Sequence, residues 1–441
     1  MAKKIQDYNF AYDFLRYYTD IALKLSYRQI EYVGREFIPK DGAVIFAPNH
    51  TNALMDAMVI LAMDHRPKVY VARADIFRNP KIAKILSFLK IMPIMRMRDG
   101  YEEVKKNNET IERAVDVLRD GVPFCIFPEG THQAKYSSLP LSKGIFRIAL
   151  SAVELMPDTP LYIVPVGIRY GSFFRFRSTV RVQIGEPINV GRFITEKSDL
   201  SPAEQIGAMR DLLTERMHRS IFHIPNDEDY DAIYEICATV VKQQVKNYKF
   251  VVDGKPLKGL DAHFEANNRT IREIAQLRET QPEVAQELLR LGQEAYDMRT
   301  AQSISLKSVS VKYPIFSRIL KVLFLIVTLP YTLPASLLTL PLNGVTAYLF
   351  TLIKDPAFRN SVRYLVNLVL WPVLMIIYSV VAYIALPWQW ALPLTLALLP
   401  APIVAQESWR LVRLLISDIK LLCNKSLRLK YREIKKIISK Q

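Results

Sequence analysis

Short apolar runs alternate with helical patterns between residues 28 and 225 of this 441-residue chain. The runs are rich in Val, Ile, Phe or Tyr and are bounded by Gly, Pro or charged residues, as buried strands are. The expected strands are Gly42–Ala47, Lys68–Ala72, Pro123–Phe127, Tyr162–Gly167 and Val180–Ile184. The helical patterns between them include Tyr101–Asp120 and Ser142–Leu155. This alternation predicts an α/β domain at 28–225, with a mixed, mostly parallel sheet flanked by helices.

Residues 1–27 predict an amphipathic helix that precedes this domain. Asp13, Arg16 and Asp20 interrupt the apolar residues, so the segment lacks the continuous apolar core of a signal peptide. The apolar and aromatic positions recur at helical spacing: Phe10, Phe14, Tyr17, Tyr18, Ile21 and Leu25. Such a helix lies either on the domain or on a membrane surface.

Residues 226–312 have a different composition, which is polar and rich in Glu, Gln, Arg and Leu. Asn267–Glu279 and Pro282–Met298 show the periodicity of amphipathic helices. We therefore expect a helical, charged region here, and no residues in it indicate a particular chemistry.

Residues 313–406 contain two long runs without a charged residue, Val322–Phe350 and Tyr364–Gln406. A membrane-spanning helix needs about 20 apolar residues. A charge at the bilayer centre costs about 3 kcal/mol, so runs of this length are informative. They favour membrane helices over the alternative, which is a set of buried helices in a soluble core.

The flanking charges and the prolines predict how these runs are arranged. Three prolines break the first run: Pro330, Pro334 and Pro341. Basic residues flank it at both ends: Arg318, Lys321, Lys354, Arg359 and Arg363. By the positive-inside rule both ends are cytoplasmic, which predicts a re-entrant or interfacial hairpin. The second run is long enough for a two-helix hairpin that turns near Pro387–Trp390 and returns to Arg410 and Arg413 on the same side.

The tail, residues 407–441, is basic and ends in an amphipathic pattern. Its Lys and Arg side chains could hold anionic lipid headgroups at about 1 kcal/mol each. The alternative is a solvated helical end.

The formal net charge of +16 indicates a polyanionic partner, either nucleic acid or an anionic membrane. A nucleic-acid binder needs a basic patch interleaved with aromatic residues. Here the positive charge flanks the apolar runs instead, so we expect a membrane and no nucleic acid. The three cysteines, Cys125, Cys237 and Cys423, are too dispersed for a disulfide framework or a metal site and are typical of a reducing compartment.

Polar residues follow the strand that ends at Ala47, in the order Pro48-Asn49-His50-Thr51-Asn52, and Asp56 precedes a helical pattern over Ala57–Ala62. If the intervening residues loop, the Asp56 carboxylate can bind one imidazole nitrogen of His50 and fix its tautomer. The other nitrogen can then take a proton from a hydroxyl. By itself, this block leaves a structural His–Asp pair open.

Two further blocks offer an anion site and an apolar strand. Lys90–Arg98 presents Arg96 and Arg98 at the end of an apolar stretch, where a guanidinium can bind phosphate oxygens with its planar fork. Ile163–Gly167 is an apolar strand with a proline, which suits a sheet edge or a strand end. It could line an acyl-chain groove, and taken alone it is more typical of a core strand.

The remaining block, Phe127–His132, runs from a buried strand into a tight turn. Glu129 is placed to accept hydrogen bonds from a polyol, and Gly130 allows a ligand to approach the backbone closely. Lys143 follows shortly after. A plain turn at a strand end is the alternative for this block alone.

In this order and spacing, the four blocks resemble the phospholipid/glycerol acyltransferase family. The His50 block is similar to its His/Asp motif, and Phe127–Thr131 is similar to its FPEGT motif. Ile91–Arg96 and Ile163–Val166 resemble its second and fourth motifs, and the resemblance covers roughly residues 28 to 220. It implies a glycerol-3-phosphate acyltransferase-like fold, followed by a helical region and C-terminal membrane helices.

One departure points to a branch of the family. Five residues separate His50 from Asp56, whereas most members have four. The stretch NHTNALMD resembles the fungal-type glycerol-3-phosphate/dihydroxyacetone-phosphate acyltransferases, as does KDPAFRNSVRY at residues 354–364.

The resemblance implies a mechanism. His50, oriented by Asp56, removes a proton from the acceptor hydroxyl, which attacks the thioester of an acyl-CoA or acyl-carrier protein. The residues implied in acceptor binding are Arg96 for the phosphate, Arg98 and Lys143 as helpers, and Glu129, Gly130 and Thr131 for the glycerol backbone. The reaction requires neither a metal nor a further cofactor.

The expected reaction is acylation of the sn-1 hydroxyl of glycerol 3-phosphate, with dihydroxyacetone phosphate as a further acceptor. The enzyme would act at the membrane, with its catalytic domain on the cytoplasmic side, in phospholipid synthesis. Acylation of 1-acylglycerol 3-phosphate uses the same motifs and stays open. A more distant alternative is a non-catalytic lipid-binding membrane protein, in which changes at His50 and Asp56 would leave function unchanged.

Overall fold

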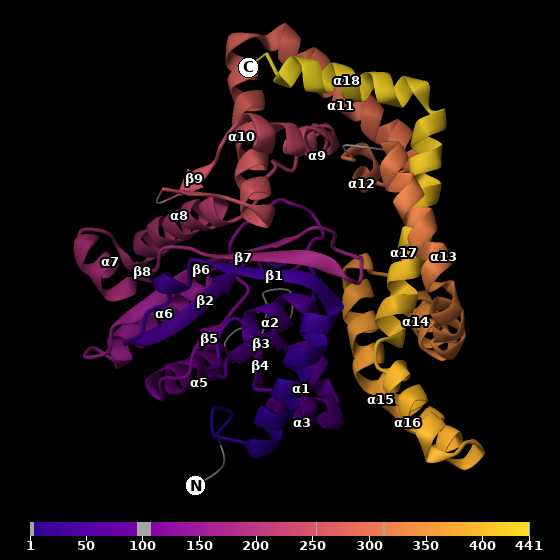
Figure 1. The fold of residues 1–441 in the computed structure, drawn as a ribbon. Coiled ribbons are helices and arrows are strands. Elements are labelled where there is room, and N and C mark those ends of the chain that lie inside the picture. Colours follow the sequence, from indigo (N-terminus) through magenta and orange to yellow (C-terminus); the bar gives the residue numbers. More distant parts are fainter. Residues whose placement is uncertain (1–3, 95–106, 253, 312–313, 441) are drawn as a thin grey trace. The chain divides into compact units, whose positions relative to one another are not determined.

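The computed structural model describes residues 4–94, 107–252, 254–311 and 314–440, so Arg96 and Arg98 lie outside the described residues. The chain divides into two compact units (Figure 1). The first comprises Met1–Ile221 together with Leu352–Leu365. The second comprises Phe222–Thr351 together with Val366–Gln441.

One sheet forms the centre of the first unit, and the described residues contribute eight strands to it. The strands are β1 (Tyr27–Val33), β2 (Ala43–Pro48), β3 (Val69–Arg73), β4 (Ile91–Ile94), β5 (Phe124–Cys125), β6 (Leu161–Tyr170), β7 (Ser178–Ile184) and β8 (Ile188–Asn189). Their order is β1-β7-β6-β2-β5-β3-β4, with β8 beside β6. Strands β6, β2, β5, β3 and β4 are mutually parallel, while β7 and β8 run antiparallel to β6. The predicted mixed, mostly parallel sheet is confirmed.

All five expected strands are present, with shifted ends. Strand β6 is longer than expected and ends at Tyr170, whereas β5 is shorter and stops at Cys125, before the chain turns at Pro128-Glu129. Strand β1 was not predicted, because its sequence YRQIEYV carries Arg28, Gln29 and Glu31. It lies at an edge of the sheet, where polar side chains are tolerated, so its apolar pattern is weak.

Helices cover both faces of this sheet (Figure 1). They are α1 (Phe10–Ser26), α2 (Leu54–Leu61), α3 (Pro80–Phe88), α5 (Asn107–Arg119), α6 (Gly144–Leu155), α7 (Val190–Glu196) and α8 (Pro202–Ser220). On one face, α5, α6 and α8 share a core with β2 through residues such as Leu118, Phe146 and Leu213. Helix α2 is tied to β3 by a hydrogen bond from the Tyr70 hydroxyl to the Ala57 carbonyl (3.0 Å). These layers bury the sheet and leave its edges and strand ends for function.

The expected N-terminal helix is present as α1, but its predicted apolar face does not pack on the domain. Tyr12, Arg16 and Leu23 are buried. Phe14 is 70% exposed, and the other apolar and aromatic positions that predicted the helix are exposed as well. The Arg16 guanidinium donates to backbone carbonyls just after α2, including that of His65 (2.5 Å). Helical periodicity identified the helix but not the face that packs against the protein.

In the second unit, the described residues of the charged region, 226–252 and 254–311, form a helical bundle. Its main helices are α9 (Tyr230–Asn247), α10 (Gly259–Thr280) and α11 (Pro282–Ala301), with a short α12 (Leu306–Val309) and a two-stranded β9 (Val251–Val252) and β10 (Lys255–Pro256). The basic tail joins this bundle as α18 (Lys425–Ile438). Tyr431 of α18 donates to the buried Glu235 carboxylate of α9 (2.6 Å), to which Arg299 of α11 also donates (2.8 Å). The apolar stripe of the tail therefore packs on protein.

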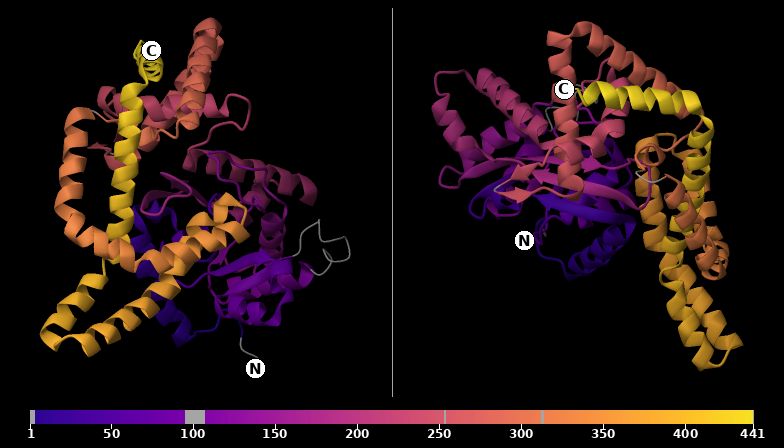
Figure 2. Two further views of the ribbon diagram at one scale, coloured as in Figure 1. Left: turned by 90° about the vertical axis from the view of Figure 1, so that its right-hand side faces the viewer. Right: turned by 45° about the horizontal axis from the view of Figure 1, so that its top comes forward.

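The other helices are apolar and lie mostly in the second unit: α13 (Pro314–Leu338), α14 (Leu340–Leu352), α15 (Arg359–Ala385), α16 (Trp388–Leu398) and α17 (Ala401–Cys423). Among the described residues, two helices, Pro314–Leu338 and Pro356–Ala385, are long and apolar enough to cross a membrane. A third span is possible if α16 and α17, bent by 53°, count as one. In the first run, Pro330 and Pro334 lie inside α13 without ending it. Helices α13 and α17 run side by side (Figure 2). An ion pair between Lys321 and Asp418 joins them.

Candidate active site

The chemistry-bearing residues follow strands whose carboxyl ends meet at one edge of the sheet. His50 comes just after β2, the Phe127–Glu129 turn follows β5, and Tyr170 is the last residue of β6. Strands β2, β5 and β6 are parallel, so these ends lie together. This edge of an α/β sheet is where ligands usually bind.

His50 and Asp56 form a direct contact. His50 Nδ1 lies 2.8 Å from Asp56 Oδ2, and the Asp56 side chain is completely buried while 19% of the His50 side chain is exposed. Since a carboxylate only accepts hydrogen bonds, Nδ1 carries the proton and Nε2 keeps its lone pair. Ala53, between the two residues, has a left-handed φ of 46°, which lets the five-residue gap close into a loop.

Three more donors hold the Asp56 carboxylate. The backbone N–H groups of Thr51 and Asn52 donate to Oδ2 (2.7 Å each), and the Tyr170 hydroxyl donates to Oδ1 (2.7 Å). Four donors in all fix the position of the buried carboxylate, which in turn fixes the imidazole of His50. Sequence reasoning missed Tyr170. Its place at the end of the strand that contains the Ile163–Gly167 block was a possible signal.

The His50 ring is also held by aromatic neighbours. Phe127 stacks on it with ring centroids 4.2 Å apart, and His132 meets it edge-on at 5.3 Å. His132 Nε2 in turn lies 2.9 Å from Asp355 Oδ2, in a segment of the first unit that is distant in sequence. His132 ends the Phe127–His132 block, but no role was predicted for it or for Asp355.

Glu129 is the second carboxyl group at this edge. It is 6% exposed, and neither oxygen meets hydrogen-bond geometry with a described residue. Burial raises the pKa of Glu129 to about 8; the nearby backbone N–H groups of His50 and Leu139 oppose the rise, and the Asp56 charge adds to it. The side chain is therefore mostly protonated at neutral pH, so it can donate a hydrogen bond as well as accept one.

Comparison with known proteins identifies this part of the chain. Residues 29–169 match the acyltransferase family. This domain belongs to the acyltransferase family. The resemblance predicted from the four motifs is thereby confirmed.

Individual relatives of the acyltransferase domain differ in the acceptor that their names give. Glycerol-3-phosphate O-acyltransferase 2 of Saccharomyces cerevisiae is 33% identical over 31% of this chain and 18% of its own length. A 1-acyl-sn-glycerol-3-phosphate acyltransferase of Borreliella burgdorferi is 28% identical over 32% of this chain and 54% of its own. The crystal structure of the 1-acyl-sn-glycerophosphate acyltransferase of Thermotoga maritima is 22% identical with a TM-score of 0.34, covering 47% of this chain and 79% of that one. The chain thus spans about a fifth of the yeast relative and half of the Borreliella one.

The other expected acceptor-binding residues of the acyltransferase domain lie around the Glu129 turn or outside the described residues. Gly130 has a left-handed φ of 66°, and a Cβ there would meet nothing within 4 Å. Its turn conformation, rather than crowding, therefore favours glycine. Thr131 and Lys143 are exposed, and Ser142, next to Lys143, donates its N–H to the Pro128 carbonyl (2.7 Å). Arg96 and Arg98 stay predictions.

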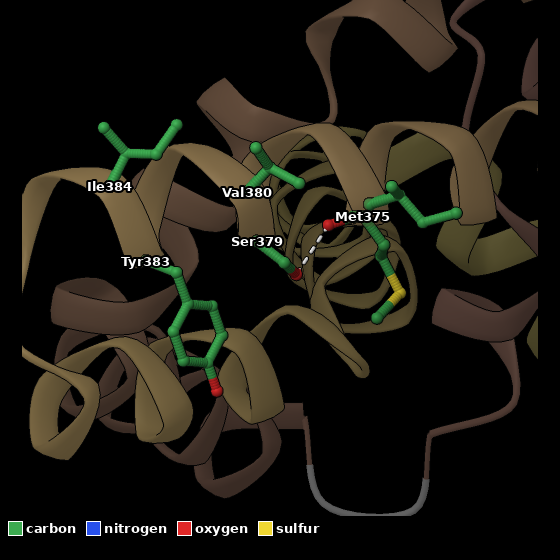
Figure 3. A pocket seen from close by; sticks show the side chains of 6 residues that line it. Met375, Ser379, Val380, Tyr383 and Ile384 are labelled. Atoms are coloured by element: carbon green, nitrogen blue, oxygen red, sulfur yellow. Dashed lines mark hydrogen bonds between the residues drawn. The ribbon is translucent and has the colours of Figure 1, made fainter.

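Outside the acyltransferase domain, a hollow of about 440 Å³ lies on α15 (Figure 3). Its lining is mostly apolar: Met375, Ile376, Ser379, Val380, Tyr383 and Ile384. The Ser379 hydroxyl already donates to the Met375 carbonyl (2.7 Å). This surface suits contact with apolar chains and offers no acid–base group for acyl transfer. Among the described residues, no group of three His, Cys, Asp or Glu side chains could hold a metal ion.

Proposed function

We propose that this protein transfers a fatty acyl group from a thioester to a hydroxyl of a glycerol phosphate acceptor at a membrane, with glycerol 3-phosphate as the acceptor. The observation that carries the proposal is the His50–Asp56 pair. Its 2.8 Å contact, its buried carboxylate and the remaining lone pair on Nε2 support His50 as the general base.

Each proton in the reaction is moved by His50. Nε2 takes the proton of the acceptor hydroxyl as its oxygen attacks the thioester carbonyl, and Asp56 stabilises the imidazolium that forms. When the tetrahedral intermediate collapses, the C–S bond breaks and the sulfur leaves with that proton. General-base assistance supplies about 10²–10⁴-fold, and positioning of the two substrates supplies the rest.

Glu129, together with Gly130 and Thr131, positions the glycerol backbone in this proposal. Neither oxygen of this buried carboxyl group meets hydrogen-bond geometry with a described residue, and a bound hydroxyl would supply such a partner. Because its pKa is raised to about 8, Glu129 stays neutral beside the Asp56 anion. The site therefore does not repel the acceptor phosphate with a second negative charge.

The acceptor phosphate is assigned to Arg96, with Arg98 and Lys143 as helpers. Support for Arg96 comes from its place in the chain, since it follows β4, which is parallel to the other strands of the site. Support for Lys143 comes from the Ser142–Pro128 hydrogen bond, which brings its backbone beside the Glu129 turn.

The choice of acceptor rests on the yeast relative and on the five-residue spacing between His50 and Asp56. The name of the yeast relative gives glycerol 3-phosphate as the acceptor, and dihydroxyacetone phosphate is a further candidate. The second candidate function is acylation of 1-acylglycerol 3-phosphate, which the name of the Borreliella relative favours. The two candidate membrane spans support delivery of a lipid product to the bilayer, and the basic residues that flank them support a cytoplasmic catalytic domain.

An acceptor panel tests this proposal. The full chain, purified in detergent, receives a radiolabelled long-chain acyl-CoA and either glycerol 3-phosphate, dihydroxyacetone phosphate or 1-acylglycerol 3-phosphate. We expect labelled lysophosphatidate from glycerol 3-phosphate. Turnover of 1-acylglycerol 3-phosphate alone would overturn the acceptor assignment, and parallel reactions with an acyl-carrier-protein donor identify the thioester.

A further inference from the structure

The segment that connects α14 to α15 is anchored in the acyltransferase unit, although most of both helices belongs to the second unit. It contains a short 3₁₀ helix, Pro356–Phe358, and the first turns of α15. The Asn360 amide donates to the Phe173 carbonyl (3.1 Å), and the Tyr364 hydroxyl donates to the Thr19 carbonyl of α1 (2.9 Å). Both side chains are buried, so these two residues anchor the connection in the interior of the acyltransferase unit.

Asp355, the residue just before the 3₁₀ helix of this segment, reaches the active site. Its Oδ2 lies 2.9 Å from His132 Nε2, and its Oδ1 accepts the Ala357 N–H (2.9 Å). Partial burial opposes ionisation, but the Ala357 N–H and His132 together hold the pKa of Asp355 below its usual value. Asp355 is therefore a carboxylate whose two oxygens are both fixed, which suits a residue that orients another.

His132 is held from three directions. Asp355 binds its Nε2, Phe358 packs on the ring edge-to-face at 5.2 Å, and the ring meets His50 at 5.3 Å. Two of the three contacts come from the connecting segment. The His132 ring, together with Phe127 on the face of His50, leaves the catalytic imidazole little freedom to rotate away from Asp56.

We propose that Asp355 is a positioning residue for acyl transfer, which holds His132 edge-on against His50 so that the connection between two apolar helices completes the active site. This inference rests on the proposed function, and it extends the site to a segment more than 200 residues away in sequence. It links the connection between α14 and α15 to the catalytic base through contacts within the acyltransferase unit.

Kinetics of Asp355→Asn test the inference, with the acceptor that the wild-type protein acylates. Orienting partners of this kind are typically worth about 10-fold or more, so we expect kcat to fall about 10-fold. The KM for the acyl donor should stay within about twofold, since both Asp355 oxygens are engaged by His132 and the Ala357 N–H. Asp211→Asn, at an exposed position on α8, is the matched control and should retain wild-type kcat.

A double-mutant cycle separates positioning from a general structural effect. In a His132→Gln background, Asp355→Asn should change kcat by less than about twofold, because its effect passes through His132. Asp355→Glu, which keeps the carboxylate, should recover part of the lost rate. Wild-type kcat in Asp355→Asn, or an equal loss in both backgrounds, would overturn the inference.

Chemical modification of the histidines tests the role of Asp355 without a measurement of catalytic turnover. Diethylpyrocarbonate acylates accessible neutral imidazoles, and peptide mapping reports each histidine separately. We expect His50 to react several-fold faster in Asp355→Asn than in the wild type, while the exposed His65 reacts equally in both. Equal rates at His50 would contradict the inference. Absence of acyl transfer by the wild-type protein to any acceptor would instead overturn the proposed function.

Discussion

Replacing Glu129 by Gln is expected to stabilise the protein at alkaline pH and to change its stability little near pH 5. The pKa of this buried carboxyl is raised from its ordinary value of 4.5 to about 8, chiefly by burial. Gln is nearly isosteric and does not titrate. The comparison therefore isolates the free-energy cost of ionising the side chain inside the site.

The sign follows from the protons bound by each state. Between pH 4.5 and about 8 the unfolded chain has lost the Glu129 proton, whereas the folded protein keeps it. The free energy of unfolding then decreases as pH rises, by about 1.4 kcal/mol per pH unit. The stabilising contribution is complete below pH 4.5 and is lost by about pH 8, a total of up to about 5 kcal/mol.

Thermal unfolding of both proteins in one detergent, at about pH 5 and about pH 8.5, measures this effect. At about 2–4 °C per kcal/mol, the melting temperature of Glu129→Gln should exceed that of the wild type by roughly 10 °C or more at the higher pH. Glu215→Gln, at an exposed position on α8, controls for the loss of one surface charge. If the melting temperatures of Glu129→Gln and the wild type differ by the same amount at both pH values, the assignment of a raised pKa to Glu129 is refuted.

Three further substitutions test the geometry around Asp56. Tyr170→Phe removes the hydroxyl that donates to Oδ1, and the lost hydrogen bond to a buried carboxylate should cost about 1.5–3 kcal/mol of unfolding free energy in denaturant titrations. Ala53→Gly relieves a left-handed φ of 46° and should stabilise the protein by about 1 kcal/mol with activity retained; destabilisation would contradict strain at this loop. Asp56→Asn should lower kcat by about 10²–10⁴-fold in steady-state assays while the melting curve shows a folded protein.

The sheet could be predicted from the sequence because its central strands are buried on both faces. Strands β2 and β6 are continuous apolar runs, which a single sequence shows clearly. The edge strand β1 could not be predicted from the sequence, because solvent and neighbouring loops tolerate its polar residues. Helix α1 shows a second limit: an apolar stripe marks a helix, but the same stripe fits a protein core, a membrane or another partner.

The candidate site likewise contains some residues whose contacts could be predicted from the sequence and others whose contacts could not. His50 and Asp56 are six residues apart, so a short loop between a strand and a helix sufficed to predict their contact. Tyr170 and Asp355 reach the site from 114 and 223 residues away from their hydrogen-bonding partners. Their contacts depend on the order of strands in the sheet and on the docking of a distant segment. Neither the strand order nor this docking can be predicted from the spacing of residues along the chain.

The most direct test of the account is the single-turnover rate of acyl transfer to glycerol 3-phosphate by His50→Ala, measured with enzyme in excess over a labelled acyl-CoA. The account predicts a rate about 10²–10⁴-fold below that of the wild type in a variant that remains folded, because the only group assigned to take the hydroxyl proton has been removed. A rate within about twofold of the wild type would contradict the assignment of His50 as the general base.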